Sequence, residues 1–403
     1  MTHATGKPDA INLVVAGAGY AGLHIALRLG TWLGRHPNVD CTLVDQHDYH
    51  QVLTELPRVV AGSRPEGELR VPLDTVLSSH VHFALRPITG FDLAGKQLLT
   101  EAGPLPYTWL VLALGSRPND FDIPGLAEHV LYLWSVEDAA RVWAAVNASV
   151  EKAGSEPDEV ERRRLLTVVI GGGGATGVEL AGGLAEEMPA LARAHGLDTD
   201  EVQVIIVEAG PTILAGSSPQ LIGNATDLLA RLGVRVCTNS MIAQATENSF
   251  TLKNGEAIRG GVFIWAGGVK APELISGSGL PVGYNGRIKV DQYLRALDHP
   301  NIFVAGDLAS VVDSETGRAL PPLAQIAIDE GESVAHNLQA AIVERPLSPF
   351  HFHDKGFVLS VGKRGVVEAA GIELHGRLAH TLKDAIEWEY RQSVKHLRGW
   401  ASL

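Results

Sequence analysis

The chain has 403 residues, with 33 Lys and Arg against 46 Asp and Glu, which gives a formal net charge of −13. At roughly 150 residues per domain, this length predicts two or three domains, each with its own core. The two cysteines, Cys41 and Cys237, exclude a disulfide framework, a Cys-x-x-Cys redox pair and a cysteine-based zinc site. The acidic balance offers no electrostatic footprint for nucleic acid, so no such partner is expected.

The first unit with a chemical signature begins near the N-terminus. Residues 11–16 predict a buried strand, followed by the glycine turn G-A-G-Y-A-G at 17–22 and then by a helical pattern of apolar residues. Residues 42–45 predict the next strand, which ends in Asp45. The order of strand, glycine turn, helix and acid-terminated strand is typical of a dinucleotide-binding unit.

The same order recurs in the middle of the chain. A strand is predicted at 167–170, the turn G-G-G-A-T-G follows at 172–177, and a strand at 204–207 leads into Glu208. In each turn the glycines permit the tight bend, the approach of the backbone to a pyrophosphate, and close packing of helix on strand. A carboxylate at Glu208 repels a 2′-phosphate, so we expect NADH to be preferred over NADPH.

Three more apolar strands close on glycine, at 110–116, 262–268 and 301–307. Together with the two units, these segments resemble the two-dinucleotide-binding-domain flavoproteins, and within them are most similar to the type II NADH dehydrogenases. The resemblance runs from Ile11 to about Glu389. Its more specific pieces are D-Y-H at 48–50, G-V-E-L-A-G at 177–182, P-L-A-Q-I-A at 322–327 and D-K-G at 354–356.

The resemblance implies an α/β fold with two Rossmann-like domains, one for FAD and one for NADH, and a C-terminal α+β segment. The expected limits are 10–125 and 269–345 for the FAD domain, 126–268 for the NADH domain and 346–403 for the C-terminal membrane or dimer segment. The implied FAD contacts are Gly17, Gly19, Tyr20, Ala21, Gly22, Asp45, Gln46, Ala113, Gly115, Gly306, Asp307, Ala324 and Gln325. The implied NADH contacts are Gly172, Gly174, Ala175, Thr176, Gly177, Glu179, Glu208, Ala266 and Gly267.

Three residues are expected to act in the reaction: Glu179, Gln325 and Lys383. Glu179 matches a carboxylate near the nicotinamide, and the alternative is an acid that complements the helix dipole. Gln325 begins the family's quinone-site motif, whose closing glutamine is replaced here by Asp329. Lys383 matches a lysine beside the quinone site, where a partly desolvated lysine donates a proton. The alternative for Lys383 is a solvated helix face.

The C-terminal residues predict an amphipathic helix, with apolar residues every three or four positions at Leu378, Leu382, Ile386, Tyr390, Val394, Leu397 and Trp400. Most charged residues of this segment, Lys383 and Glu387 among them, fall off that stripe. The helix suits a membrane interface, and packing on its own domain or on a second subunit, in a homodimer, is the alternative. No run reaches 18 apolar residues, so any membrane contact is expected to be peripheral.

We therefore expect a non-proton-pumping NADH:quinone oxidoreductase on the cytoplasmic face of the cell membrane, with menaquinone or ubiquinone as acceptor. Flavin alone carries the electrons, because Cys41 and Cys237 are expected to be small buried hydrophobes. The alternatives are a reductase of a ferredoxin- or rubredoxin-type carrier, an apoptosis-factor-like redox sensor, and a biosynthetic quinone reductase. No metal is expected, since His351 and His353 are assigned to a surface strand.

Overall fold

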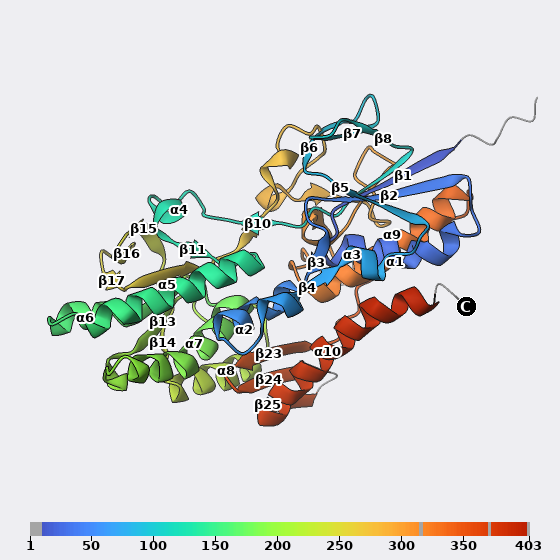
Figure 1. Ribbon diagram of the computed structural model, residues 1–403. Coiled ribbons are helices and arrows are strands. Elements are labelled where there is room, and N and C mark those ends of the chain that lie inside the picture. The colour runs from blue at the N-terminus through green and yellow to red at the C-terminus, as the bar shows by residue number, and fades with distance from the viewer. Residues whose placement is uncertain (1–9, 314–316, 370–371, 401–403) are drawn as a thin grey trace, which may run out of the picture.

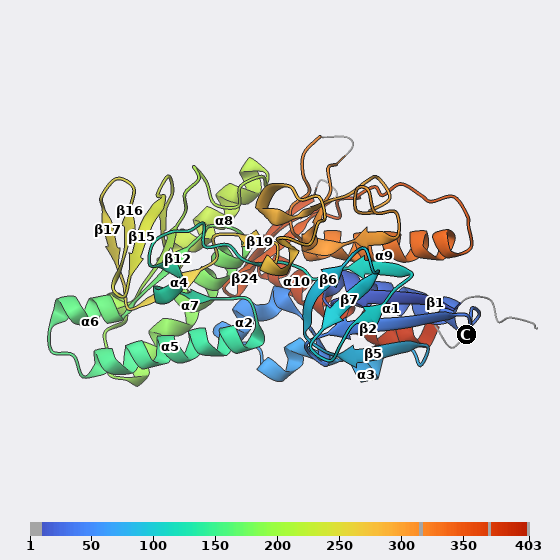
Figure 2. The same ribbon diagram turned by 90° about the horizontal axis from the view of Figure 1, so that it is seen from above.

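The structure, a computed structural model, describes residues 10–313, 317–369 and 372–400. It consists of two lobes side by side, with the C-terminal segment running beneath both (Figures 1 and 2). Each lobe is built on a five-stranded parallel sheet flanked by helices. The predicted α/β class with two Rossmann-like sheets is confirmed.

The first sheet has the order β21-β9-β1-β2-β5, and all its neighbouring strands run parallel. Leu13, Val15 and Leu43 are fully buried in it, as expected for apolar strands that are covered on both faces. Its edge strand β21 comes from the last third of the chain. The elements of this lobe are β1 (Ile11–Ala16), β2 (Val39–Asp45), β5 (Val81–Leu85), β9 (Trp109–Leu112), β21 (Ile302–Val304), α1 (Tyr20–Leu33), α3 (Leu73–Val76) and α9 (Ala324–Ile342).

The second sheet has the order β11-β18-β12-β13-β14, again with parallel neighbours. Its central strand β12 is buried along its whole length. The elements of this lobe are β11 (Leu131–Tyr132), β12 (Thr167–Gly171), β13 (Gln203–Val207), β14 (Arg235–Cys237), β18 (Val262–Trp265), α4 (Leu126–His129), α5 (Val136–Gly154), α6 (Glu159–Leu165), α7 (Ala175–Ala194) and α8 (Pro219–Arg231).

Three antiparallel sheets of three strands each are added to the two lobes. Two are appended to the lobes, and the third lies against α7 and α8 before the chain enters α10, which runs beneath the first lobe (Figure 1). Their strands are β6 (Ile88–Asp92), β7 (Gln97–Thr100) and β8 (Leu105–Pro106); β15 (Ile242–Thr246), β16 (Ser249–Leu252) and β17 (Ala257–Arg259); and β23 (Phe357–Val361), β24 (Arg364–Ala369) and β25 (Ile372–Gly376), followed by α10 (Arg377–Trp400).

The chain crosses between the lobes twice, and the two crossings pair as the antiparallel ribbon of β10 and β19. These crossings lie close to the expected domain limits at 125 and 268, which stay predictions. The remaining short elements are β10 (Arg117–Pro118), β19 (Val269–Lys270), β3 (Tyr49–Gln51), β4 (Arg70–Pro72), β20 (Ile288–Lys289), β22 (Ala309–Ser310), α2 (Leu56–Val60) and 3₁₀ turns at Leu53–Glu55, Glu66–Leu69, Thr199–Glu201, Glu273–Ile275, Tyr284–Gly286 and Gly306–Leu308.

Two local expectations need comment. The strand expected at His351 and His353 does not form. Immediately after these residues the Asp354 carboxylate accepts the Gly356 N–H at 2.8 Å and closes a turn. Cys41 is fully buried in β2, where burial raises the pKa of its thiol to about 12, as expected of an inert residue. Cys237 in β14 is only half-buried.

Candidate active site

The first glycine turn joins β1 to α1 and leaves no room for side chains at two of its three glycines. A Cβ on Gly17, whose φ is +103°, would lie 2.3 Å from the carbonyl oxygen of Ala113. A Cβ on Gly22 would lie 1.8 Å from the carbonyl oxygen of Gly17. At Gly19 a Cβ would meet no protein atom within 4 Å, so the space beside this residue is free for a ligand.

The second turn, between β12 and α7, repeats this geometry. Gly172 has φ of +113°, and its Cβ would lie 2.4 Å from the Ala266 carbonyl oxygen. A Cβ on Gly177 would lie 2.0 Å from the Gly172 carbonyl oxygen, whereas one on Gly174 would again meet nothing within 4 Å. The two glycine turns that recur in the sequence therefore have the same backbone geometry.

The two acids at the strand ends bind the turns that they follow. The Asp45 carboxylate accepts the Ala18 N–H at 2.6 Å and the His47 N–H at 2.9 Å. The Glu208 carboxylate accepts the Gly173 N–H at 2.7 Å and, like Asp45, the N–H two residues further along, at 2.6 Å. Each acid thus fixes its turn and lies at the edge of the adjoining cavity.

A cavity adjoins each turn. The first, of about 360 Å³, is lined by Gly17, Gly19, Asp45, Gln46, Ala113 and Gly115. The second, of about 770 Å³, is lined by Gly172, Gly174, Ala175, Glu208, Ala266 and Gly267 together with Gln325. Neither α1 nor α7 has a side-chain N-cap or an acid in its first turn, so the helix amides beside both cavities are left for an anion. Both sites fit the pyrophosphate of a dinucleotide.

Replacement of Gly174 by Ala is expected to weaken NADH binding at least about tenfold, roughly 1.4 kcal/mol, while the flavin content stays unchanged. The new methyl group meets only open space in the protein, so any loss of affinity reports a ligand beside this residue. NADH titration of the flavin-loaded protein measures the effect. Gly223→Ala is the matched control, because its Cβ is equally free but lies on α8. An unchanged NADH affinity in the Gly174 variant would contradict this placement.

A third group of residues lies where β21 and α9 meet the first sheet. Ser116 donates its hydroxyl to the Asp307 carboxylate at 2.7 Å, and burial raises the pKa of Asp307 although this bond opposes the shift. Arg287 donates to the Asp307 carbonyl oxygen at 3.0 Å. Gly306, in the left-handed region with φ of +75°, donates its N–H to the Glu330 carboxylate at 2.6 Å.

Glu330 is fully buried, and burial raises its pKa to about 8, so its carboxyl group is largely protonated at neutral pH. Its other oxygen, Oε1, has no hydrogen-bond partner among the described residues. Sequence reasoning missed Glu330 and Arg287, because neither burial nor pairing is visible in the letters around them.

The start of α9 places Gln325 between the lobes. Its side-chain amide donates to the Gly356 carbonyl oxygen at 3.4 Å and borders the 770 Å³ cavity of the second turn. Asp329, one turn along, accepts a hydrogen bond from Lys355 Nζ at 2.7 Å. The acid that departs from the family motif is thus paired with a lysine of the D-K-G segment.

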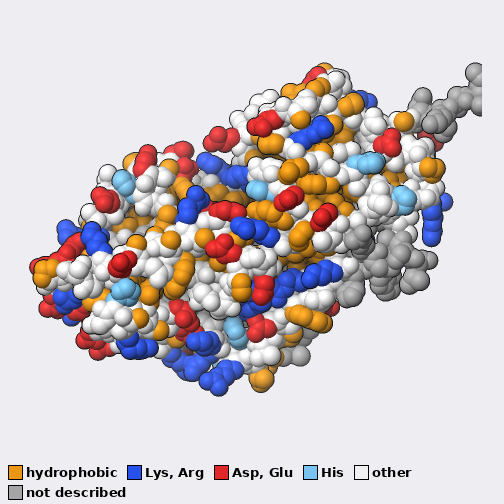
Figure 3. Space-filling model, in the orientation of Figure 1, with side chains coloured by type: hydrophobic (Ala, Val, Ile, Leu, Met, Phe, Trp, Pro, Cys, Tyr) orange, Lys and Arg blue, Asp and Glu red, His pale blue; other side chains and the backbone are white. Residues whose placement is uncertain are grey.

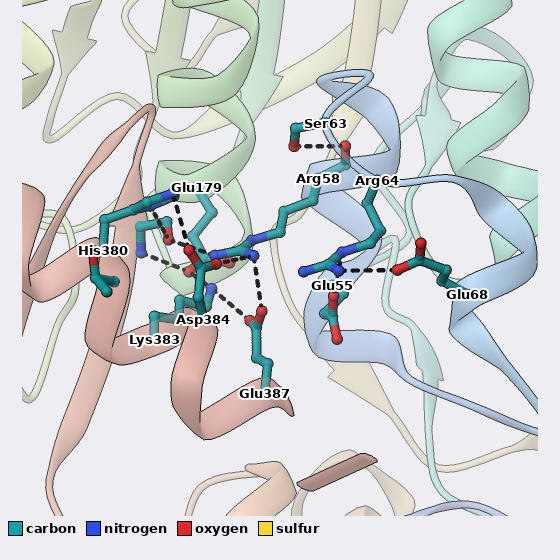
Figure 4. A network of polar contacts seen from close by, with 12 residues as sticks. Glu55, Arg58, Ser63, Arg64, Glu68, Glu179, His380, Lys383, Asp384 and Glu387 are labelled. Atoms are coloured by element: carbon teal, nitrogen blue, oxygen red, sulfur yellow. Dashed lines mark hydrogen bonds and ion pairs between the residues drawn. The ribbon is translucent and has the colours of Figure 1, made fainter. Parts of the chain in front are cut away.

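Glu179 and Lys383, far apart in sequence, form a buried ion pair between α7 and α10 (Figure 4). Glu179 also accepts the Ser360 N–H at 2.9 Å, and Lys383 Nζ lies 3.4 Å from Glu387 Oε1. Lys383 is 5 % exposed, so the alternative of a solvated helix face is wrong. Glu179 lies beyond the first turn of α7, and its partners come from β23 and α10, which does not support a dipole-complementing role.

The pair continues into a wider network of charges. Arg58 Nη1 contacts Asp384 Oδ1 at 2.5 Å and Glu387 Oε2 at 3.1 Å (Figure 4). Burial raises the pKa of Glu387 to about 7, although Lys383 and Arg58 oppose the shift. The network borders a cavity of about 630 Å³ between α2, α7 and α10. Arg58 and its neighbours on α2 carry no motif, so sequence reasoning did not find them.

The apolar stripe expected along α10 is divided between two faces, which corrects the prediction for the side chains that the structure describes; those of Leu397 and Trp400 lie outside them. Val394 and Tyr390 are packed inside, on the same face as Lys383 and Glu387, which were expected on the polar side. Among the side chains of β25 and α10 that the structure describes, five large apolar ones are exposed: Leu374, Leu378, Leu382, Ile386 and Trp388. In Figure 3 hydrophobic side chains lie beside Lys and Arg side chains in this region. None of the helices in the described ranges is both long and apolar enough to span a membrane.

Some of the residues predicted to contact a cofactor do not line either turn cavity. Tyr20 is buried, with its hydroxyl 3.2 Å from Thr54 Oγ1 and its ring against His50. Thr176, Ala21 and Ala324 lie in the first turns of their helices and do not line the two turn cavities. Across the described part of the chain, no cluster of three His, Cys, Asp or Glu residues is arranged to hold a metal ion.

Comparisons with known proteins identify the family of the chain. The family model for pyridine nucleotide-disulphide oxidoreductases matches residues 11–331. The type II NADH:quinone oxidoreductase of Staphylococcus haemolyticus is 31 % identical over 386 residues, 94 % of each chain. That of Staphylococcus saprophyticus is 29 % identical over 384 residues, again 94 % of each.

Solved structures share the fold. NDH2 from Plasmodium falciparum in complex with NADH superposes with a TM-score of 0.86 at 17 % identity, covering 97 % of each chain. The sulfide:quinone oxidoreductase of Aquifex aeolicus reaches 0.79 at 19 % identity, over 96 % of this chain and 92 % of that one. On the family match and the curated relatives, the chain belongs to the pyridine nucleotide-disulphide oxidoreductase family and, within it, to the type II NADH:quinone oxidoreductases.

Proposed function

We propose that this protein transfers hydride from NADH to FAD and passes the electrons to a membrane quinone, without pumping protons. Membership of the family makes it an FAD-dependent NADH oxidoreductase, and the names of its relatives support quinone as the acceptor. The observation that carries the proposal is on α10. This helix buries Lys383 against Glu179 on one face and exposes Leu378, Leu382 and Ile386 on another.

Each of the two turns is proposed to bind one of the two cofactors. The amides at the start of α1 and the turn of Gly17 would hold the FAD pyrophosphate, with Asp45 at its ribose and Asp307 nearby. The turn of Gly172 would hold NADH, with Glu208 at its ribose. FAD, when bound, supplies a centre that accepts a hydride and releases electrons to a second acceptor.

Side chains of the protein are proposed to orient the quinone and to supply protons for its reduction. Reduction of a quinone to the quinol consumes two protons, and Lys383 Nζ holds one of its protons toward Glu179 inside the protein. Gln325 offers a neutral amide beside the cavity of the second turn, where it can donate a hydrogen bond without adding charge. On these grounds we assign Gln325 and Lys383 to the acceptor side of the reaction, with Glu179, which is expected near the nicotinamide, holding Lys383 in place.

The acceptor is tested by stopped-flow absorbance of the flavin. The holoenzyme is first reduced with NADH, then mixed separately with menaquinone, ubiquinone and ferredoxin, and recovery of the flavin absorbance is timed. We expect a quinone to be the fastest acceptor. Faster recovery with ferredoxin would instead indicate a soluble-carrier reductase, and slow recovery with every acceptor would indicate a redox sensor.

The exposed apolar face of α10 is proposed to contact the membrane, at the cytoplasmic side. The triple variant Leu378→Ser, Leu382→Ser, Ile386→Ser should pellet with anionic phospholipid vesicles at least about tenfold less, since each buried leucine contributes on the order of 1.5–3 kcal/mol. Point substitutions are preferable to deletion of 388–403, which also removes the inward-facing Tyr390. Val160→Ser, at a 72 % exposed apolar site on α6, is the control.

Unchanged pelleting of the triple variant would count against membrane contact by this face. Analytical ultracentrifugation of the same variant tests the other occupant, a second copy of the chain. A dimer lost on substitution would assign the face to a subunit interface.

A further inference from the structure

A chain of two hydrogen bonds connects the C-terminal helix to the first glycine turn. The hydroxyl of Tyr390, on α10, lies 2.9 Å from His50 Nε2, and His50 Nδ1 lies 3.0 Å from the carbonyl oxygen of Ala18. Ala18 is the residue between Gly17 and Gly19. Tyr390, about 370 positions further along the chain, is thus connected to the first glycine turn through two hydrogen bonds.

With a neutral imidazole, only one arrangement of protons satisfies both bonds. The Ala18 carbonyl can only accept, so His50 Nδ1 carries the proton and donates it. His50 Nε2 is then an acceptor, and the Tyr390 hydroxyl donates to it. Burial lowers the pKa of His50 to about 4 and raises that of Tyr390 well above 10, so both groups are neutral across the physiological range.

The second turn holds the equivalent carbonyl by a different means. Gly173 corresponds to Ala18, because each donates its N–H to the acid at the end of the next strand. The Gly173 carbonyl oxygen accepts a backbone N–H, that of Leu214, at 2.8 Å. One copy of the duplicated turn is therefore fixed by the local main chain, and the other by a side-chain relay from the C-terminal helix.

The surroundings keep the relay in place. His50 is fully buried, with the Tyr20 ring edge-on at 5.0 Å, and Tyr390 stacks on His24 at 5.9 Å between ring centroids. One residue further along α10, Arg391 contacts the buried carboxylate of Glu55 at 3.1 Å. His50 therefore makes both of its hydrogen bonds away from water, where a lost hydrogen-bond partner is not replaced by solvent.

We propose that His50 and Tyr390 are positioning residues for the flavin: they fix the Ala18 carbonyl and so make retention of FAD depend on how α10 is seated. The inference rests on the proposed placement of FAD at the first turn. NADH binding at the second turn does not depend on the relay, because Gly173 is held by the main chain. The C-terminal helix is thereby linked to one cofactor and not to the other.

The test uses the holoenzyme and the variants Tyr390→Phe, His50→Asn and the double variant. Tyr390→Phe removes only the hydroxyl, and asparagine at position 50 keeps a donor for Ala18 but has no link to Tyr390. Free-flavin fluorescence after dilution gives the dissociation constant for FAD, and titration gives that for NADH. Tyr293→Phe, a tyrosine outside the relay, is the control.

Tyr390→Phe is expected to weaken FAD binding about three- to tenfold, the range for loss of one hydrogen bond, with NADH affinity unchanged. In the His50→Asn background the same substitution should have no further effect. An equal effect of Tyr390→Phe in both backgrounds, or an equal loss of NADH affinity, would overturn the relay and indicate general packing.

A further variant, Asp45→Asn, distinguishes failure of the relay from failure of the proposed FAD site at the first turn. Asp45→Asn alters the acid that binds the first turn and is expected to weaken FAD binding whether or not the relay matters. If Asp45→Asn weakens FAD binding and Tyr390→Phe does not, the relay alone fails. If neither variant changes FAD affinity, the placement of FAD at the first turn fails as well.

Discussion

Replacement of Lys383 by methionine is expected to destabilise the folded protein by about 3–5 kcal/mol, the usual cost of removing one partner from a buried ion pair. Lys383 Nζ contacts both Glu179 and Glu387, and the exposed fractions of all three side chains are below 10 %. Glu387 can take up a proton, because burial has already raised its pKa to about 7. The carboxylate of Glu179 is then left buried without its cation.

Chemical denaturation at neutral pH measures this loss, and Lys363→Met is the matched control. Lys363 is 76 % exposed and contacts Glu186 and Glu187 at the surface, so its removal should cost less than about 1 kcal/mol. Adding Glu179→Gln to the Lys383 variant should recover part of the stability, since it removes the stranded charge. Equal, small losses in the two lysine variants would contradict the buried pair.

A second large effect is expected from Glu330→Gln and depends on pH. The carboxyl group of Glu330 has a pKa of about 8 in the folded protein against 4.5 in an exposed chain. As the pH rises from about 4.5 through 8, the unfolded state ionises and the folded state does not, so the wild type loses stability. Glutamine cannot ionise, and its carbonyl still accepts the Gly306 N–H.

The variant should therefore gain on the wild type by about 1.4 kcal/mol for each pH unit within this window. Denaturation at pH 5.5, 6.5 and 7.5, values chosen to span about two units of it, gives the slope. Buried groups that do not interact with Glu330 contribute equally to both proteins and cancel in the difference. A difference between variant and wild type that stays flat across this range would show that the buried carboxyl group of Glu330 titrates normally.

The local parts of the site were predictable because each depends on a short stretch of chain. The two glycine turns, their helices and the acids at Asp45 and Glu208 all lie within some 40 residues of each other in their own unit, and the structure builds them as expected. A Cβ on residue 22 would overlap the carbonyl oxygen of Gly17, so only glycine fits there, and its presence in the sequence indicates the tight turn. The wrong expectations were of another kind: the strand at His351 and the orientation of α10.

Orientation of α10 could not be read from periodicity, because a stripe of apolar residues shows that a face exists but not what covers it. The chain buries Lys383 and Glu387 beside Val394 and leaves Leu378 exposed, since buried partners for those charges arrive from α2 and α7. Local sequence was sufficient for the two glycine turns, whose geometry is set within a single strand–turn–helix unit. Only the tertiary structure decided which charged groups are buried, which ion pairs they form, and how Tyr390 is linked to Ala18 through His50. The reason is that burial and long-range hydrogen bonds exist only once distant segments share a core.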